Sequence, residues 1–165
     1  MLPRLPRDGS VSVTPAVLPP LPPDYSLGAS SLAQRDDVCE AVIRFLARSN
    51  RCVIGFENAV QKGLVHHDPT DVLLTRVRDL GDRVLPVSQL KGLRVVDGMV
   101  VDYVDLEGKV KMYWLWGMSV ESEDRATFDG LVQWRASGGG ISYRYWLART
   151  AGKWVVVKEE PGAAF

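Results

Sequence analysis

The chain has 165 residues, of which 46% are hydrophobic and 24% are charged, a composition that excludes a collagen-like or wholly disordered protein. This length corresponds to one domain with a sizeable core. Lys and Arg together number 20, as do Asp and Glu, so the chain lacks the concentrated positive charge of a dedicated nucleic-acid binder. No window is apolar over the roughly 20 residues of a membrane span, and no signal-peptide core is present. We therefore expect a cytoplasmic protein with no nucleic-acid or membrane partner.

A proline-rich arm is predicted for residues 1–30, because the run Leu18-Pro-Pro-Leu-Pro-Pro-Asp24 favours extended polyproline II and forbids a helix. The arm is either a flexible or surface-packed extension or a PxxP ligand for an aromatic groove. Residues 31–165 are then a single α+β domain.

Helices are predicted in the first half of this domain. Apolar residues recur with the helical period over about 36–49, where Asp37 and Glu40 have capping-box spacing. A second helix is predicted over about 70–80, after the cap at Asp68-Pro69-Thr70. Between them, residues 51–60 fit a strand or a helix, and we favour a helix over 55–62.

The second half changes to the two-residue period of strands. Residues 84–87 contain a proline and are predicted as an edge segment or a crossing into the sheet. A strand over 99–104 is expected to form a hairpin with the next one through a turn at Gly108. Strands joined by short turns predict an antiparallel meander over 110–120, 126–134, 141–149 and 154–158.

Helices followed by a run of antiparallel strands predict an α+β fold, with two or three N-terminal helices on one face of a curved sheet of four to five strands. The closing hairpin over 143–157, with Gly152-Lys153-Trp154 at its turn, resembles the nuclear-transport-factor-2-like (NTF2-like), or cystatin-like cone, superfamily. The resemblance covers about residues 36–160, and residues 74–88 are similar to small bacterial members of unknown role. It implies a cone-shaped sheet around a cavity. Isomerases and dehydratases of that superfamily use Asp, Tyr or His residues in the cavity and no cofactor.

Four residues are candidates for acid/base chemistry. His66 and His67 are either a general base or metal ligands, or two exposed residues beside a helix cap; no spacing announces further ligands, so no metal is predicted. Asp129 lies in mid-strand and either faces the cavity, where it would shuttle a proton, or faces water. Tyr113 is a candidate donor to an oxyanion or a packing aromatic.

A pocket or an interface is expected from the aromatic residues of the strands. The five tryptophans exceed what two helices can cover, so some are expected to line a pocket for a small apolar ligand or a homodimer face. The candidates for this role are Trp114, Trp116, Tyr143 and Tyr145. Cys39 and Cys52 match no redox or zinc spacing and are expected to be buried and reduced, with a disulfide as the alternative.

The sequence lacks the motifs GxSxG, Walker A, GxGxxG and HExxH, which removes the common hydrolases and nucleotide enzymes. Two hypotheses remain. The first is a non-catalytic binding or protein-interaction module, either monomeric or homodimeric, such as an immunity protein. The second is an isomerase, dehydratase or cyclase without a cofactor that uses Asp129, Tyr113, His66 and His67 in the cone.

Overall fold

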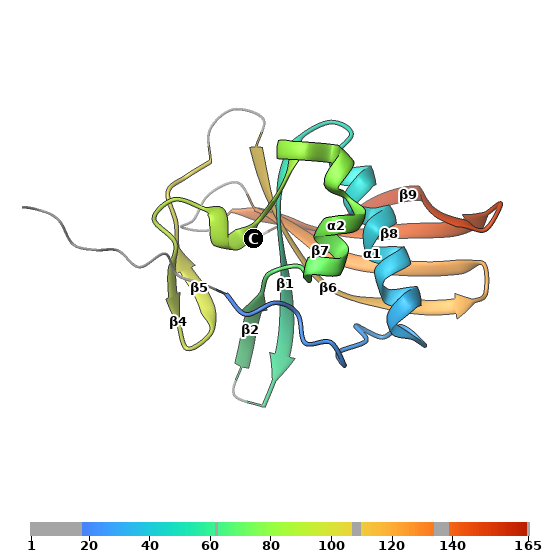
Figure 1. The fold of residues 1–165 in the computed structure, drawn as a ribbon, viewed down its shortest axis with the longest axis horizontal. Coiled ribbons are helices and arrows are strands. Elements are labelled where there is room, and N and C mark those ends of the chain that lie inside the picture. The colour runs from blue at the N-terminus through green and yellow to red at the C-terminus, as the bar shows by residue number, and fades with distance from the viewer. Residues whose placement is uncertain (1–17, 62, 107–109, 134–138, 165) are drawn as a thin grey trace, which may run out of the picture.

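A mixed sheet of seven strands forms the frame of the protein (Figure 1). This computed structural model describes residues 18–61, 63–106, 110–133 and 139–164. The strand order is β2-β1-β6-β7-β8-β9, and β3 also pairs with β1. The strands of this sheet are β1 (Arg51–Val60), β2 (Gly63–His67), β3 (Val84–Pro86), β6 (Val110–Ser122), β7 (Arg125–Gln133), β8 (Gly140–Thr150) and β9 (Lys153–Ala164). A separate two-stranded ribbon is formed by β4 (Arg94–Val96) and β5 (Met99–Asp102).

One long helix, α1 (Leu32–Leu46), occurs among the described residues, and it lies across β7 to β9 (Figure 1). It begins earlier than expected because Ser31 is the N-cap and accepts a hydrogen bond from the backbone N–H of Gln34. The helix α2 (Asp71–Arg76) is capped by Thr70 and is shorter than predicted. Two 3-10 helices follow, η1 (Arg78–Arg83) and η2 (Val87–Gln89). No helix in the described ranges is long and apolar enough to span a membrane.

The expected fold class is wrong. Instead of two or three helices on an antiparallel sheet of four to five strands, one long helix packs on a larger, mixed sheet. The predicted helix over 55–62 is also wrong, because residues 51–60 form β1, which pairs in parallel with both β3 and β6. The antiparallel meander from β6 to β9 is confirmed.

The hairpin expected between residues 99–104 and β6 is wrong as well. β5 pairs with β4, through a turn at Asp97 and Gly98 whose φ angles are both positive. Gly108 lies outside the described residues. The proline-containing segment 84–87 does enter the sheet edge, as β3.

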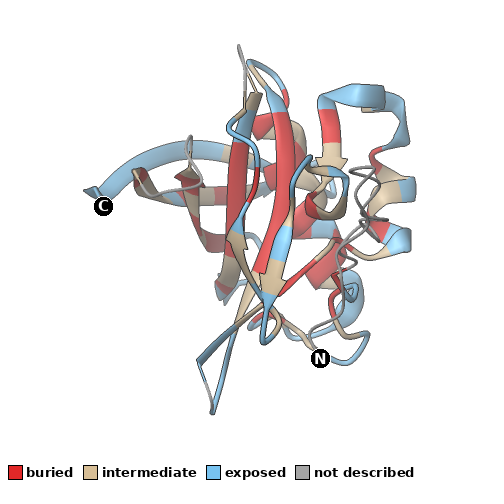
Figure 2. Ribbon diagram, turned by 90° about the vertical axis from the view of Figure 1, so that its left-hand side faces the viewer, coloured by how far each residue is buried: buried red, intermediate tan, exposed pale blue. Residues whose placement is uncertain are grey.

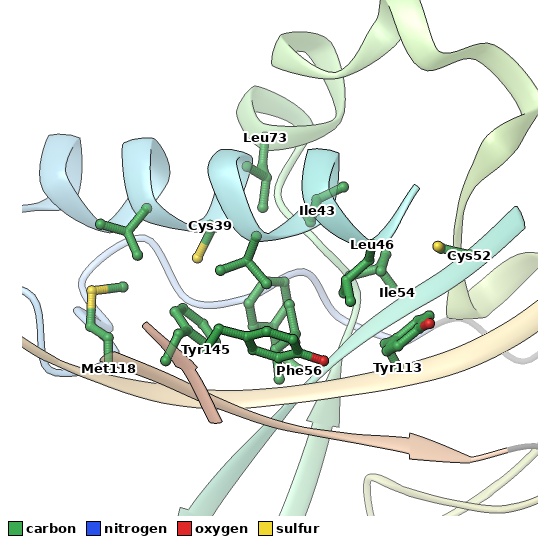
Figure 3. Close-up of a cluster of buried hydrophobic side chains, with 14 of the residues drawn as sticks. Cys39, Ile43, Leu46, Cys52, Ile54, Phe56, Leu73, Tyr113, Met118 and Tyr145 are labelled. Atoms are coloured by element: carbon green, nitrogen blue, oxygen red, sulfur yellow. The ribbon is translucent and has the colours of Figure 1, made fainter. Parts of the chain in front are cut away.

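Two hydrophobic cores lie on opposite faces of the sheet. The first lies under α1 and includes the fully buried Phe56 and Tyr145 (Figure 3). Phe128 is fully buried in the same core. The second is built around Trp114 and Met112 and is closed by η2, the β4–β5 ribbon and Leu18. Figure 2 shows that burial is concentrated along the central strands, whereas the strand that leads to the C-terminus is largely exposed.

The described part of the proline-rich segment packs on the domain. Leu18, Leu21 and Leu27 are buried, and the backbone N–H of Leu21 donates to the carbonyl oxygen of Asp68 at 2.9 Å. Cys39 and Cys52 are buried and form no disulfide, as expected.

Candidate functional site

A polar pocket of about 230 Å³ lies between the C-terminal end of α1 and the inner face of the meander. Three tyrosines line it, Tyr113 from β6 and Tyr143 and Tyr145 from β8. We refer to it as the tyrosine pocket. Its other lining residues are Phe45, Leu46, Arg48, Ser49, Asn50, Lys111, Val132 and Glu159.

Strand alternation and register bring the tyrosines together. Tyr143 and Tyr145 are two residues apart on β8 and therefore share a face. Their ring centroids are 6.2 Å apart, with an interplanar angle of 18°. Tyr113 reaches the same face from β6, and Figure 3 shows its ring and that of Tyr145 on the side of the sheet that faces α1. Glu159 on β9 is the direct cross-strand neighbour of Tyr145.

The hydroxyl groups of the two buried tyrosines stay protonated at physiological pH. Burial raises the pKa of Tyr113, and the nearby Glu159 carboxylate raises it further. Burial also raises the pKa of Tyr145, with the Glu159 carboxylate as the next contribution. Both side chains are therefore neutral hydrogen-bond donors, suited to a ligand with an acceptor group and unsuited to act as a base.

The remaining polar groups of the pocket add charge of both signs. Lys111 and Arg48 supply cations, and Glu159 supplies the carboxylate. The amide of Asn50 interacts with the Tyr113 hydroxyl. The pocket can thus hold a small polar molecule through phenol donors on one side and charged groups around its mouth.

His66 connects the β4–β5 ribbon to the main sheet and is not part of a catalytic arrangement. Its Nδ1 accepts a hydrogen bond from the backbone N–H of Val100 at 2.9 Å, which leaves the proton on Nε2, 3.3 Å from Oε1 of Glu57. Its ring stacks on Trp114, with centroids 3.9 Å apart and an angle of 19°. The backbone N–H of His66 also donates to the carbonyl oxygen of Gly98 at 2.8 Å.

His67, the next residue of β2, is also buried. Neither ring nitrogen makes a hydrogen bond of good geometry to the described part of the chain. Burial lowers the pKa of the imidazole, while the carbonyl of Pro19 partly opposes the shift. Neither histidine is the exposed cap neighbour considered from the sequence, and neither lines the tyrosine pocket. Among the described residues no group of three or more His, Cys, Asp and Glu side chains could hold a metal ion.

Asp129 lies on the opposite face of the sheet from the tyrosines. Both of its carboxylate oxygens accept hydrogen bonds from Arg144, at 2.8 and 3.2 Å, and its side chain is 32% exposed. Together with Trp116 and Trp146 it borders an open cleft of about 440 Å³ on this outer face. The reading of Asp129 as part of a solvated strand face agrees with this position.

The tryptophans are divided among several environments. Trp114 is buried in the second core, where its Nε1–H donates to Oε1 of Gln133 at 3.1 Å. Trp116 and Trp146 are half-buried on the outer face, and Trp154 is buried against α1. Trp134 lies outside the described residues.

Of the residues proposed from the sequence, the structure brings together Tyr113, Tyr143 and Tyr145 in the tyrosine pocket, which neither Asp129 nor the histidines line. Tyr143 also borders the outer cleft, together with Asp129 and Trp116. Sequence reasoning missed Lys111, Asn50 and Glu159. A β-bulge explains the last of these, because Val157 has no partner on β8 and shifts Glu159 onto the tyrosine face. Simple alternation from Trp154 would place Glu159 on the other face.

No protein-family model, curated protein or solved structure matches this chain. The resemblance to the NTF2-like superfamily therefore stays a prediction from the sequence.

Proposed function

We propose that the protein is a non-catalytic binding module that holds a small polar molecule in the tyrosine pocket. The observation that carries this proposal is the convergence of three tyrosine side chains from two strands on one cavity of about 230 Å³. Concave sites with a few converging polar groups are the usual form of small-ligand sites. A polar ligand suits this lining better than the apolar one expected from the tryptophan content.

The chemistry of the lining defines the ligand class. The neutral hydroxyls of Tyr113 and Tyr145 and the ammonium group of Lys111 favour a carboxylate or carbonyl oxygen. Glu159 favours a hydroxyl or amino group on the same molecule. We therefore propose a small hydroxy- or amino-carboxylate, or a related carbonyl compound.

The positions of the acid/base candidates support a binding role over an enzymatic one. Asp129 is paired with Arg144 on the outer face, His66 is held by Val100 and Glu57 in the second core, and neither lines the tyrosine pocket. The raised pKa values of Tyr113 and Tyr145 also oppose their use as bases. The enzymatic hypothesis from the sequence would need Asp129 or a histidine beside the tyrosines, whereas the carboxylate that lines this pocket belongs to Glu159.

A thermal-shift screen with small carboxylates and carbonyl compounds tests the proposal. A compound present at 100 times its dissociation constant stabilises the folded state by about 2.7 kcal/mol. We expect Tyr143→Phe to weaken such a compound, and Tyr25→Phe, a tyrosine outside the pocket, to leave its binding unchanged. Asp129→Asn should also have no effect. The proposal fails if no compound stabilises the protein, or if stabilisation persists undiminished in Tyr143→Phe and Lys111→Ala.

The homodimer and the cytoplasmic location stay predictions. The half-buried Trp116 and Trp146 on the outer face are where a second copy would pack. Light scattering over a range of concentrations tests this, and a monomer at the highest concentration would contradict it.

A further inference from the structure

The strand β9 leaves one of its edges unpaired among the described residues. It is the last strand in the order of the sheet, and β8 is its one partner among the described strands. Figure 2 shows that most of it is exposed, and Val155 and Val157 are 42% and 58% exposed. An exposed edge presents free N–H and C=O groups to which another extended chain can add as a strand.

The turn before β9 determines which N–H and C=O groups of β9 bond to β8 and which point outward. Ala151 and Gly152 form a two-residue turn with φ angles of 50° and 78°, typical of a type I′ hairpin. In such a hairpin the flanking residues exchange hydrogen bonds, and hydrogen-bonded pairs then alternate with non-hydrogen-bonded ones. Val155 therefore bonds to β8, while the N–H and C=O groups of Trp154 and Val156 point outward.

Only a short part of this edge is regular. The bulge at Val157 interrupts the pairing with β8, and Pro161 has no N–H to donate. Both features protect the C-terminal part of β9 against pairing with other strands. The usable edge is therefore Lys153–Val156.

A groove of about 590 Å³ lies between this part of the edge and α1. Ala41 and Phe45 from α1 and Trp154 and Val156 from β9 provide its apolar surface. A strand added to the edge would thus place every second side chain over this apolar surface. Recognition of this kind takes affinity from main-chain hydrogen bonds and specificity from the pocket for the side chains.

The acidic residues of the groove are already neutralised. Asp37 pairs with Arg76, and Glu40 pairs with both Arg76 and Arg44. Arg44 in turn makes a two-pronged contact with Asp79, with both N···O distances 2.8 Å. These carboxylates therefore do not attract a cationic ligand.

Two cations of the groove, Arg48 and Lys153, are not paired with a carboxylate of the described residues. The guanidinium of Arg48 lies 4.4 Å from the centre of the Phe45 ring. The groove therefore carries unbalanced positive charge beside its apolar surface. This charge favours an acidic partner.

We propose that the groove between α1 and β9 binds an extended acidic peptide of a partner protein. The peptide adds as a strand to Lys153–Val156, packs a branched apolar side chain against Phe45, and places carboxylates near Arg48 and Lys153. This site goes beyond the small-molecule function proposed above. Phe45 and Arg48 border both sites, but the tyrosines do not line the groove.

A peptide titration tests the proposal, with the full chain and the probe acetyl-Glu-Glu-Val-Ile-Val-Glu-Glu-amide carrying a fluorophore. We expect saturable binding that weakens with added salt. Replacing every Glu of the probe by Lys should abolish binding. Two further probes are methylated on one or the other set of alternate backbone nitrogens. One of the two should fail to bind and the other should bind, because only one set of N–H groups faces the edge and a methylated nitrogen cannot donate to it.

Protein variants locate the site. Lys153→Glu should weaken the probe about tenfold, since it removes one favourable charge pair and adds a repulsive one. Lys158→Glu is the matched control, a lysine on the same strand that does not line the groove, and it should change binding little. Tyr143→Phe should also leave the probe unaffected, which separates this site from the tyrosine pocket.

Several results would overturn the proposal. These are equal binding of the parent and Lys-containing probes, equal binding of the two methylated probes, no binding of the parent probe at millimolar concentration, and equal effects of Lys153→Glu and Lys158→Glu. A concentration-dependent dimer that Lys153→Glu dissociates would assign this edge to a second copy and would also overturn it.

Discussion

Replacing His66 should detach the β4–β5 ribbon from the sheet. The imidazole accepts a hydrogen bond from the Val100 N–H at 2.9 Å, contacts Glu57 at 3.3 Å and stacks on Trp114 at 3.9 Å. His66→Phe keeps the ring and most of the stacking but removes both polar contacts. His66→Ala removes the ring as well.

The expected cost follows from these contacts. A partly buried N–H left without an acceptor costs about 1–3 kcal/mol, so His66→Phe should lower the free energy of unfolding by about that amount. The stacked pair contributes about 0.5–1.5 kcal/mol beyond its buried area, and His66→Ala loses this as well as the packing of a 7% exposed side chain. We therefore expect the alanine variant to be the less stable of the two.

Urea unfolding measures both changes, and amide hydrogen exchange by NMR shows where they act. Exchange of the Val100 amide should accelerate in both variants, whereas the amides of β7 and β8 should stay protected under native conditions. The assignment of His66 as the link to the ribbon is refuted if His66→Phe is as stable as the wild type and the Val100 amide keeps its protection.

Three further predictions concern the cores. Gly55→Ala should destabilise the protein by about 1–3 kcal/mol in thermal unfolding, because an added Cβ would overlap the Trp114 ring; an unchanged midpoint would contradict this packing. Burial raises the pKa of the Cys39 thiol and raises that of Cys52 to about 12, so both should resist a thiol reagent at pH 8 until the protein is denatured, and rapid labelling of the native state would count against their burial. Burial lowers the pKa of His67, so as the pH falls below about 6.5 the unfolded chain binds a proton at this residue before the folded chain does, and the free energy of unfolding decreases. His67→Phe should lose less stability than the wild type between pH 7 and 5. Equal slopes of stability against pH would argue against this assignment.

The last two strands of the meander, β8 and β9, were predictable because the two faces of each strand are chemically different. Along β8, Tyr145 and Leu147 are buried, while Arg144 on the other face is exposed, and this contrast is visible as alternation in the sequence. β1 lacks such a contrast. Its residues Cys52–Phe56 are all buried because the strand lies between the two cores, and a short apolar run of this kind fits a helix equally well.

Two local signals in the sequence indicate the turn of the β4–β5 ribbon and the start of α1, neither of which was among the predictions. Asp97-Gly98 between short valine-rich runs is the usual signature of a tight hairpin, and it forms the turn of the ribbon. Ser31 with Gln34 three residues later marks the true start of α1.

The tyrosines of the pocket could be found from their spacing, and so could Lys111, which is two residues before Tyr113 on β6 and shares its face. Glu159 could not, because it reaches the pocket through the bulge at Val157, which depends on the pairing of β8 with β9.

The parallel pairing of β1 with β6 also determines the order in which the chain can assemble. Strands β6 to β9 close short turns, whereas Arg51 meets Val110 only after the intervening β2, α2, β3 and ribbon have been bridged. Closing a long loop costs entropy before its contacts repay it, so the meander should form early in folding and β1 should join late. The tyrosine pocket needs both α1, at the start of the domain, and β9, at its end. A ligand held there would therefore recognise only the completely folded chain and would slow its unfolding.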